Sequence, residues 1–315
     1  MATGLAGLAL ATTARAQITP PATADTTPQD PASAALAAGN DEARHLTVEV
    51  HINGQGPFHF VVDTGSEQTA LADNVADALG LERGASIQVD GIARRLPAAT
   101  AAVRELSFGP FRRKDLRLPI LPREYLAADG YLGLDVIDGS RVVFDFRHHE
   151  LRIERSYYSP AGVPGPNITR VQVYGPSGRL RAGDCVVDGI SASAFVDTGA
   201  EVSVGNMALK AALLKRNPAI GDLGPMNLSG VTGGEITGEI TPIKDISLQE
   251  LHFTDCTLVI ADVPNFGTWS LEKAPALLIG MDFLRQFASV AIDYRNKEIR
   301  FDLAGITPPL TNRRV

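Results

Sequence analysis

The tripeptide Asp-Thr-Gly occurs twice in this chain, and this duplication constrains the fold more than any other feature. The first copy is Asp63-Thr64-Gly65-Ser66, which follows the apolar run Phe60-Val61-Val62. The second is Asp197-Thr198-Gly199-Ala200, which follows Ala194-Phe195-Val196. Because short apolar runs of this kind are typical of buried strands, each aspartate is expected in a loop at the end of a strand.

The duplication extends beyond these two loops. The first copy is followed by Tyr131-Leu132-Gly133-Leu134-Asp135 and by DFRHHELRI, residues 145–153. The second is followed by Leu278-Ile279-Gly280-Met281-Asp282 and by DYRNKEIRF, residues 293–301. The two nine-residue runs share one pattern, with polar turn residues between alternating positions, which is typical of a hairpin. The chain is therefore an internal repeat whose halves share one architecture.

At these residues the chain resembles the aspartic peptidases, and in particular the bacterial retropepsin-like proteins that carry two such units in one polypeptide. The resemblance covers roughly residues 45 to 305. It implies an all-β, bilobal fold in which two retropepsin-like β-barrel lobes with short helices pair about a pseudo-two-fold axis. We place the lobes at residues 44–157 and 158–315.

The same resemblance implies that Asp63 and Asp197 form a catalytic pair. Two carboxylates about 3 Å apart cannot both ionise cheaply, so they share a proton, and the aspartic protease dyad is the established example. The ionised member would take a proton from water while the protonated member stabilises the developing oxyanion. The loops would be supported by the remaining motif residues Thr64, Gly65, Ser66, Thr198, Gly199 and Ala200.

Ser66 and Ala200 are the one asymmetry between the two loops. A serine hydroxyl after the glycine can donate a hydrogen bond to the loop carboxylate and lower its pKa. We expect Ser66 to do so for Asp63, and we expect a mildly acidic optimum because Ala200 offers no matching donor.

Two glycine-bearing hairpins are candidates for flaps that close over a bound peptide. One has Asp90, Gly91 and Ile92 near its turn, beside Arg94 and Arg95, and a plain surface hairpin is an equal alternative for it. The other has Val231-Thr232-Gly233-Gly234 at its tip and is the better candidate.

Local patterns predict several further elements. Residues 46–52 alternate between apolar and polar side chains, as in a half-buried strand, and end at the turn Asn53-Gly54. Asp188-Gly189 is the equivalent turn in the second half. Short helices are expected over residues 71–81 and 207–215.

Charge and composition exclude several classes of partner. The formal net charge is −7, whereas a nucleic-acid-binding protein needs a basic face. No apolar stretch approaches the ~18 residues of a membrane span. We expect no cofactor and no metal, because His148 and His149 occupy the turn that is Asn296-Lys297 in the other repeat and no His-Glu-x-x-His motif exists.

The first residues suggest export. Residues 1–16 are Ala-rich and end in Ala14-Arg15-Ala16, a cleavage pattern typical of signal peptides, although the usual basic start is missing. Residues 17–43, rich in Ala, Pro and Thr, read as a flexible linker. These features predict an exported, periplasmic protein. Cys185 and Cys256 form one disulfide or remain two buried thiols, and the sequence leaves both options open.

The functional hypothesis is an aspartic endopeptidase that hydrolyses extended protein segments. An inactive module of the same fold that binds peptides without cutting them is the alternative. A metallohydrolase is disfavoured by the absence of ligand spacing. Because both aspartates lie in one chain, the monomer is expected to suffice.

Overall fold

The computed structural model describes residues 46–126, 128–158, 167–175 and 180–303. It also gives the backbone of three short strands, β1 (Arg15–Gln17), β2 (Ala34–Ala37) and β3 (Gly39–Asn40). The predicted signal peptide, residues 1–16, and linker, residues 17–43, otherwise lie outside the described residues, so both stay predictions.

The first half of the chain forms a closed barrel of six strands in the order β4-β5-β10-β6-β9-β8, and β8 pairs back onto β4. The strands are β4 (Leu46–Ile52), β5 (Gln55–Val62), β6 (Ala70–Ala72), β8 (Arg95–Phe108), β9 (Phe111–Leu121) and β10 (Gly130–Leu132). Val48, Val50 and Ile52 are fully buried in its core, as the period-2 pattern of residues 46–52 predicts.

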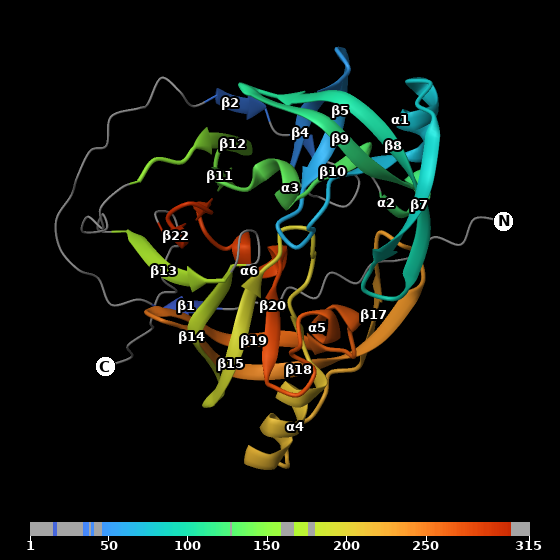
Figure 1. Cartoon of the computed structure of the whole chain (residues 1–315). Helices are drawn as coiled ribbons and strands as arrows, with labels where there is room; N and C mark the ends of the chain where they lie inside the picture. The colour runs from blue at the N-terminus through green and yellow to red at the C-terminus, as the bar shows by residue number, and fades with distance from the viewer. Residues whose placement is uncertain are drawn as a thin grey trace.

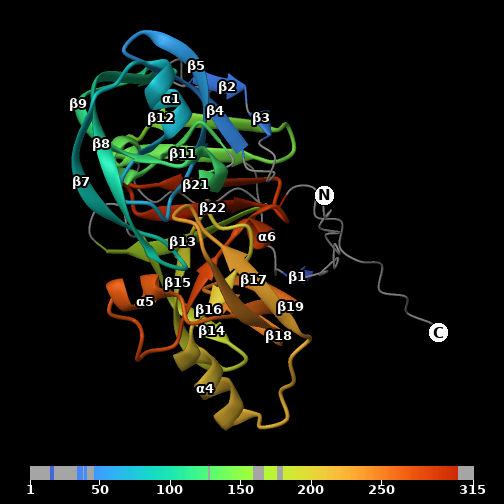
Figure 2. The ribbon, with the colours of Figure 1, turned by 90° about the vertical axis from the view of Figure 1, so that its right-hand side faces the viewer.

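The second half repeats this barrel with the order β14-β15-β20-β16-β19-β18, closed by pairing of β18 with β14. Its strands are β14 (Arg181–Val187), β15 (Ile190–Val196), β16 (Val204–Gly205), β18 (Glu235–Leu248), β19 (Leu251–Ile260) and β20 (Ala276–Ile279). Figures 1 and 2 show the two barrels at opposite ends of the molecule. The predicted all-β, two-lobed fold is confirmed.

Equivalent turns close both barrels. Asn53 and Asp188 have positive φ values of 52° and 45°, and each is followed by a glycine with positive φ, as a two-residue hairpin turn requires. The side-chain Oδ1 of Asn53 accepts hydrogen bonds from two backbone N–H groups of β8, at 2.9 and 3.1 Å. That of Asp188 accepts two from β18, at 3.0 and 2.9 Å. Both predicted turns are confirmed, and their side chains join the first hairpin of each barrel to the strand that closes it.

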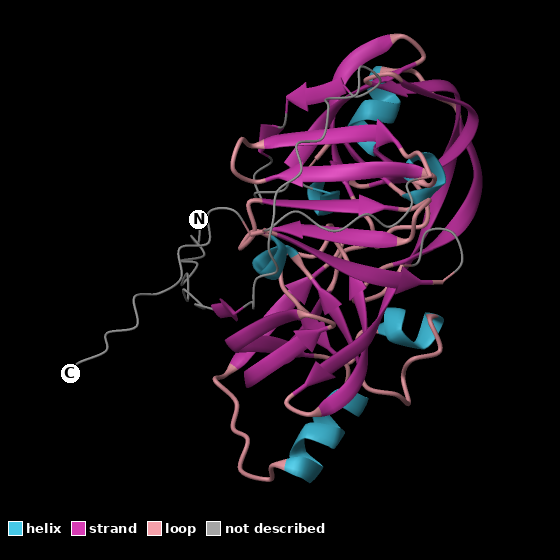
Figure 3. Cartoon of the chain, turned by 90° about the vertical axis from the view of Figure 1, so that its left-hand side faces the viewer, coloured by secondary structure: helices cyan, strands magenta, loops and turns pink. Residues whose placement is uncertain are grey.

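A shared sheet joins the halves. It runs β13-β22-β21-β11-β12-β2, and β11 of the first half pairs antiparallel with β21 of the second, with Val143 opposite Ala291. The new strands are β11 (Ser140–Asp145), β12 (Glu150–Arg155), β13 (Ile168–Tyr174), β21 (Ser289–Asp293) and β22 (Glu298–Asp302). Figure 3 shows these strands stacked across the middle of the molecule. Backbone hydrogen bonding of the two repeats therefore fixes how the lobes face each other.

The prediction of one helix over residues 71–81 is wrong at its start. Residues 70–72 form β6, which lies between β10 and β9 of the barrel, and the helix α1 covers only Asp73–Ala78. Pairing on both edges satisfies the backbone of this apolar segment as a strand, which overrides its helical pattern. The helix predicted over residues 207–215 is confirmed as α4 (Met207–Arg216), whose cap residue Asn206 accepts a hydrogen bond from the N–H of Leu209 at 2.8 Å.

Four short helices and two hairpin arms complete the repeat. The helices are α2 (Arg123–Leu126), α3 (Leu134–Ile137), α5 (Pro264–Thr268) and α6 (Met281–Leu284). The hairpin arms are β7 (Arg83–Asp90), paired with β8, and β17 (Pro225–Ser229), paired with β18.

Cys185 and Cys256 are free thiols buried in the second barrel. Burial raises the pKa of each thiol to about 12, which leaves both protonated and unreactive at neutral pH. Within the described part of the chain, no helix combines the length and apolar character needed to cross a bilayer.

Candidate active site

The two Asp-Thr-Gly loops meet between the lobes. Asp63 follows β5 and Asp197 follows β15, and each stays attached to the neighbouring strand of its own barrel. The N–H of Asp63 donates to the carbonyl oxygen of Leu132 at 3.0 Å, and that of Asp197 donates to Ile279 at 3.0 Å. Equivalent strands of the two barrels thus position the two aspartates next to each other between the lobes.

Reciprocal hydrogen bonds between the threonines hold the loops together. The N–H of Thr64 donates to Oγ1 of Thr198 at 3.1 Å, and the N–H of Thr198 donates to Oγ1 of Thr64 at 3.0 Å. Each hydroxyl then donates across the axis, Thr64 to the carbonyl of Val196 at 3.0 Å and Thr198 to that of Val62 at 2.7 Å. Both side chains are buried, so four hydrogen bonds fix the loops in a dry environment.

The glycines bring the carboxylates close. A Cβ atom added at Gly65 would lie 2.5 Å from the carboxylate atoms of Asp197, and one at Gly199 would lie 2.5–2.7 Å from those of Asp63. Each carboxylate therefore occupies the space that any other side chain would need in the opposite loop. The structure brings Asp63 and Asp197 together, and their catalytic role stays a prediction.

The environment of Asp63 favours its protonated form. Burial raises the pKa of Asp63 most, and the neighbouring Asp197 raises it further, to about 8, against hydrogen bonds from the N–H groups of Gly65 and Ser66 that lower it. Those N–H groups donate to Oδ1 of Asp63 at 2.8 and 3.0 Å. The N–H of Gly199 donates to Oδ1 of Asp197 at 2.9 Å. The pair can therefore hold one proton at neutral pH.

The expected role of the Ser66 hydroxyl is wrong. Its Oγ donates to the carbonyl oxygen of Gln68 at 2.9 Å, and only the backbone N–H of Ser66 reaches Asp63. A serine hydroxyl readily bonds the backbone two residues along a turn, and that local partner wins here. Ser66 supports the loop through its main chain, and its hydroxyl does not explain the pKa of Asp63.

A second pair of carboxylates braces the loops from behind. Oδ1 of Asp135 accepts from the N–H and hydroxyl of Thr69 at 2.9 and 2.6 Å. Asp282 accepts the equivalent bonds from Ser203 at 3.0 and 2.7 Å. Burial raises the pKa of both aspartates above the ordinary value. The repeated Leu/Ile-Gly-x-Asp segments thus anchor each loop to its own barrel.

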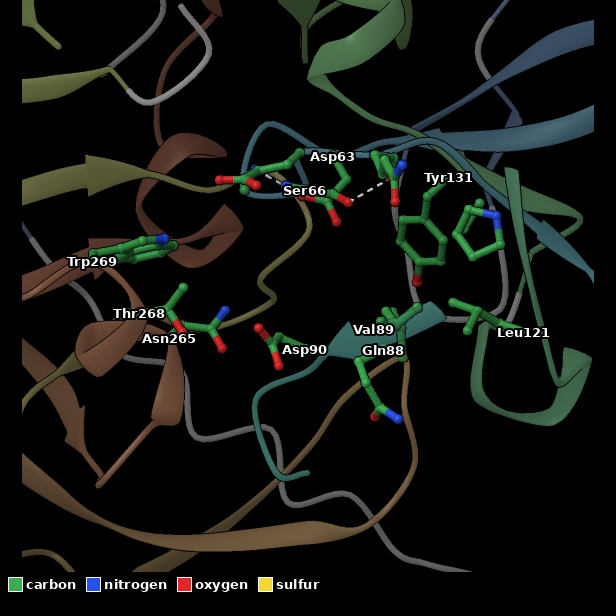
Figure 4. A pocket seen from close by; sticks show the side chains of 16 residues that line it. Asp63, Ser66, Gln88, Val89, Asp90, Leu121, Tyr131, Asn265, Thr268 and Trp269 are labelled. Carbon is green, nitrogen blue, oxygen red and sulfur yellow. Dashed lines mark hydrogen bonds between the residues drawn. The ribbon is translucent and has the colours of Figure 1, made fainter. Parts of the chain in front are cut away.

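Two adjoining pockets open around the aspartates. The larger, of about 410 Å³, touches both Asp63 and Asp197, and the smaller, of about 200 Å³, touches Asp63. Figure 4 shows the smaller pocket, with Asp63 and Ser66 on one side and Asp90, Asn265 and Trp269 around the rest.

The tips of the two predicted flap hairpins lie side by side (Figures 1 and 2), and residues of both line the larger pocket. Nε of Arg94 donates to the carbonyl of Thr232 at 2.8 Å, and the hydroxyl of Thr232 donates to the carbonyl of Arg94 at 2.8 Å. The Arg94 guanidinium also lies over the ring of Tyr125, 5.7 Å from its centroid. The tips of the two halves are joined, and Thr232 is fully buried between them.

Not every predicted flap residue lines a pocket. Asp90, Gly91, Ile92 and Val231 do, whereas Thr232, Gly233 and Gly234 do not. A Cβ at Gly91 would overlap the Thr232 hydroxyl, and one at Gly233 would lie 2.7 Å from Tyr125, so both glycines permit the tips to pack. The first hairpin is therefore no isolated surface hairpin.

Sequence reasoning missed several residues that line the cleft, Tyr125, Tyr131, Asn265, Thr268 and Trp269. It also missed the role of Arg94, which lines neither pocket but joins the two hairpin tips. Trp269 is the only tryptophan of the chain, and a single tryptophan is a candidate for contact with a ligand that the sequence alone offers. Asn265 carried no signal, because nothing in its local pattern sets it apart.

His148 lies in an exposed hairpin turn, where its Nδ1 contacts Asp145 at 3.0 Å. Across residues 46–126, 128–158, 167–175 and 180–303, no group of three or more His, Cys, Asp or Glu side chains is arranged to hold a metal ion.

The raised pKa of Asp63 predicts a pH-dependent stability. The folded state keeps a proton that the unfolded chain releases near pH 4, so stability falls as pH rises from about 4 to about 8. Asp63→Asn has no proton to release at this position, so the free energy of unfolding of the variant should decrease less over that pH range than that of wild type. The two slopes should differ by up to ~1.4 kcal/mol per pH unit. Urea unfolding at pH 5 and pH 8 measures it, with Glu82→Gln, an exposed site, as control. Equal pH slopes in wild type and Asp63→Asn would show that the pair shares no proton.

Comparison with known families agrees with the geometry. The model of a family described as aspartyl protease matches the chain in two segments, residues 48–136 and 184–283. Each segment contains one Asp-Thr-Gly loop and its bracing aspartate. A comparison with curated proteins gave no match. Because the family model matches both halves and covers more than half of the chain, the protein belongs to the aspartyl protease family.

Proposed function

We propose that this protein is an aspartic endopeptidase whose nucleophile is a water molecule activated by Asp63 and Asp197. The observation that carries the proposal is the packing of each carboxylate against the glycine of the opposite loop. Two carboxylates in that position share one proton, which supplies a base and an acid at the same pH.

Each carboxyl group has a defined part in the proposed reaction. The ionised one takes a proton from water as the oxygen attacks the peptide carbonyl carbon. The protonated one donates a hydrogen bond to the carbonyl oxygen as negative charge develops there. The proton is then passed to the leaving nitrogen as the C–N bond breaks, and the pair returns to its one-proton state.

The cleft suits an extended peptide. It lies between two barrels under a roof made by the β7–β8 and β17–β18 hairpins. Hairpin arms can bind an extended chain through main-chain hydrogen bonds, while the pockets receive alternate side chains. A peptide bound under this roof displaces water from around the reacting groups.

The dyad proposal predicts that either aspartate is essential. Asp63→Asn or Asp197→Asn should lower kcat for peptide hydrolysis by at least about 10²–10⁴-fold, because each removes one half of the acid–base unit. The measurement is cleavage of a quenched fluorescent peptide library, with Glu82→Gln as a charge-matched control and circular dichroism to verify folding. A variant that retains more than a tenth of the wild-type kcat would show that the two aspartates do not act as one acid–base unit. If the wild-type protein binds peptides but does not cut them, the alternative holds, and the protein is an inactive peptide-binding module.

The roof proposal predicts a role for Arg94. Arg94→Met keeps the length of the side chain but loses the bond to Thr232, so the closed roof is less populated and kcat/KM should fall about tenfold. Thr232→Val removes the second hydrogen bond of the bridge and should act in the same direction. The double variant should fall short of the product of the two effects, because both bonds hold the same two tips together and the second contributes less once the tips have parted. Arg104→Met, an exposed arginine of β8, is the control. Independent effects would contradict a common bridge.

One chain should suffice, because both aspartates lie in one polypeptide. The specific activity of the wild-type protein should stay constant over a hundredfold dilution. Activity that disappears together with a dimer, followed by analytical ultracentrifugation, would show instead that a second chain completes the site.

A further inference from the structure

The charged side chains that line the pockets beside Asp63 and Asp197 are all negative. Among the described residues that line them, every charged side chain is acidic: Asp63, Glu67, Asp90, Asp197 and Glu201. The whole chain, with 29 Lys and Arg, is far from lacking basic residues. A cleft lined by one sign of charge between low-dielectric walls concentrates ligands of the opposite sign.

Two of these acids have arginine partners that do not themselves line the pockets. Glu201 makes a two-pronged ion pair with Arg285, at 2.9 and 3.1 Å. Asp90 pairs with Arg95 at 2.6 Å, but both side chains are largely exposed, at 43% and 72%. An exposed pair contributes only ~0–1 kcal/mol, so Asp90 can accept a further cation at little cost.

Asn265 adds a polar acceptor that the described protein leaves unused. Its Oδ1 is shielded from solvent and has no hydrogen-bond partner within the described part of the chain. A buried acceptor without a donor costs ~1–3 kcal/mol. Asn265 lines both pockets, and Figure 4 shows its polar end and that of Asp90 turned toward the same space. A ligand that displaces the atoms covering Oδ1 and brings an N–H donor there satisfies this oxygen.

The walls of the smaller pocket suit a long aliphatic side chain. Trp269 lines it on one side, and Val89 and Leu121 line it on the other (Figure 4). The indole of Trp269 is held in place by Phe195, with ring centroids 5.1 Å apart, and by Phe266, at 6.1 Å. Lys and Arg bury their aliphatic stems along such surfaces while the charged end reaches polar groups.

We propose that the smaller pocket is the specificity pocket for a lysine or arginine side chain of the substrate. The stem lies along Trp269, and the charged head binds the Asp90 carboxylate and, once the bound side chain has displaced the atoms that cover it, Oδ1 of Asn265. This rests on the proposed endopeptidase function and makes its substrate class specific: segments with a basic residue close to the cleaved bond.

The test starts from cleavage of denatured proteins by the wild-type chain, with the cut sites mapped by mass spectrometry. Lys and Arg should be enriched at one position within three residues of the cut. Peptides that differ only at that position, with lysine or the uncharged isostere norleucine, should then differ in kcat/KM by about tenfold in favour of lysine, the effect expected of hydrogen bonds to a charged group.

Variants of the pocket then test the residues. Asn265→Leu and Asp90→Asn should each bring the lysine-to-norleucine ratio toward one, and Asn265→Asp, which adds a charge, should raise it. Glu82→Gln removes a negative charge outside the pockets and should leave the ratio unchanged. A wild-type ratio near one, or a ratio that Asn265→Leu and Asp90→Asn do not move, overturns the proposal.

Binding separates this proposal from the endopeptidase proposal. If the wild-type protein cuts no peptide, the proposed reaction fails, and fluorescence anisotropy of the same two labelled peptides tests the pocket by itself. Tighter binding of the lysine peptide, lost in Asn265→Leu, supports the specificity pocket in a protein that does not cut. Equal binding of both peptides overturns it.

Discussion

The crossed hydrogen bonds between Thr64 and Thr198 are the interaction on which the rest of the site depends. Each hydroxyl accepts from the opposite backbone and donates to the opposite strand end, so neither loop has its observed position without the other. Being buried, these bonds keep their strength, and breaking one leaves unpaired polar groups in a dry environment. The barrels supply loops at the ends of strands, and the threonines turn two loops into one site.

This arrangement forces two like charges together. The glycines that allow the threonines to approach also place each carboxylate against the opposite loop, and the pKa of Asp63 rises because its charged form is buried and faces Asp197. The cost in stability and the capacity for acid–base chemistry therefore have one cause. The bonds of Asp135 and Asp282 fix each loop on its own barrel, and the threonine bonds hold the two loops together against the repulsion.

The two halves share the same backbone architecture but differ in the side chains that line the cleft. Barrels, turns and bracing aspartates repeat, because both halves must present the same loop. The cleft walls do not repeat: the second half contributes Asn265 and Trp269 from α5 and its C-terminal cap, and the first contributes Tyr125. The bridge between the hairpin tips is unequal as well, because Arg94 comes from the first half only. An asymmetric cleft can read the direction of a peptide, which two identical halves cannot do.

The sequence by itself determined the repeat, the all-β class, the two turns at Asn53 and Asp188 and the aspartate loops, because each is written in a local pattern or in its duplication. Tertiary structure decided the rest. Residues 70–72 became a strand through pairing on both edges, and the Ser66 hydroxyl bonded Gln68 in place of Asp63. The meeting of Arg94 with Thr232, 138 residues apart, and the orphaned oxygen of Asn265 depend on how two lobes face each other. No local pattern carries that information, since it arises from the shared sheet that sets the lobes in place.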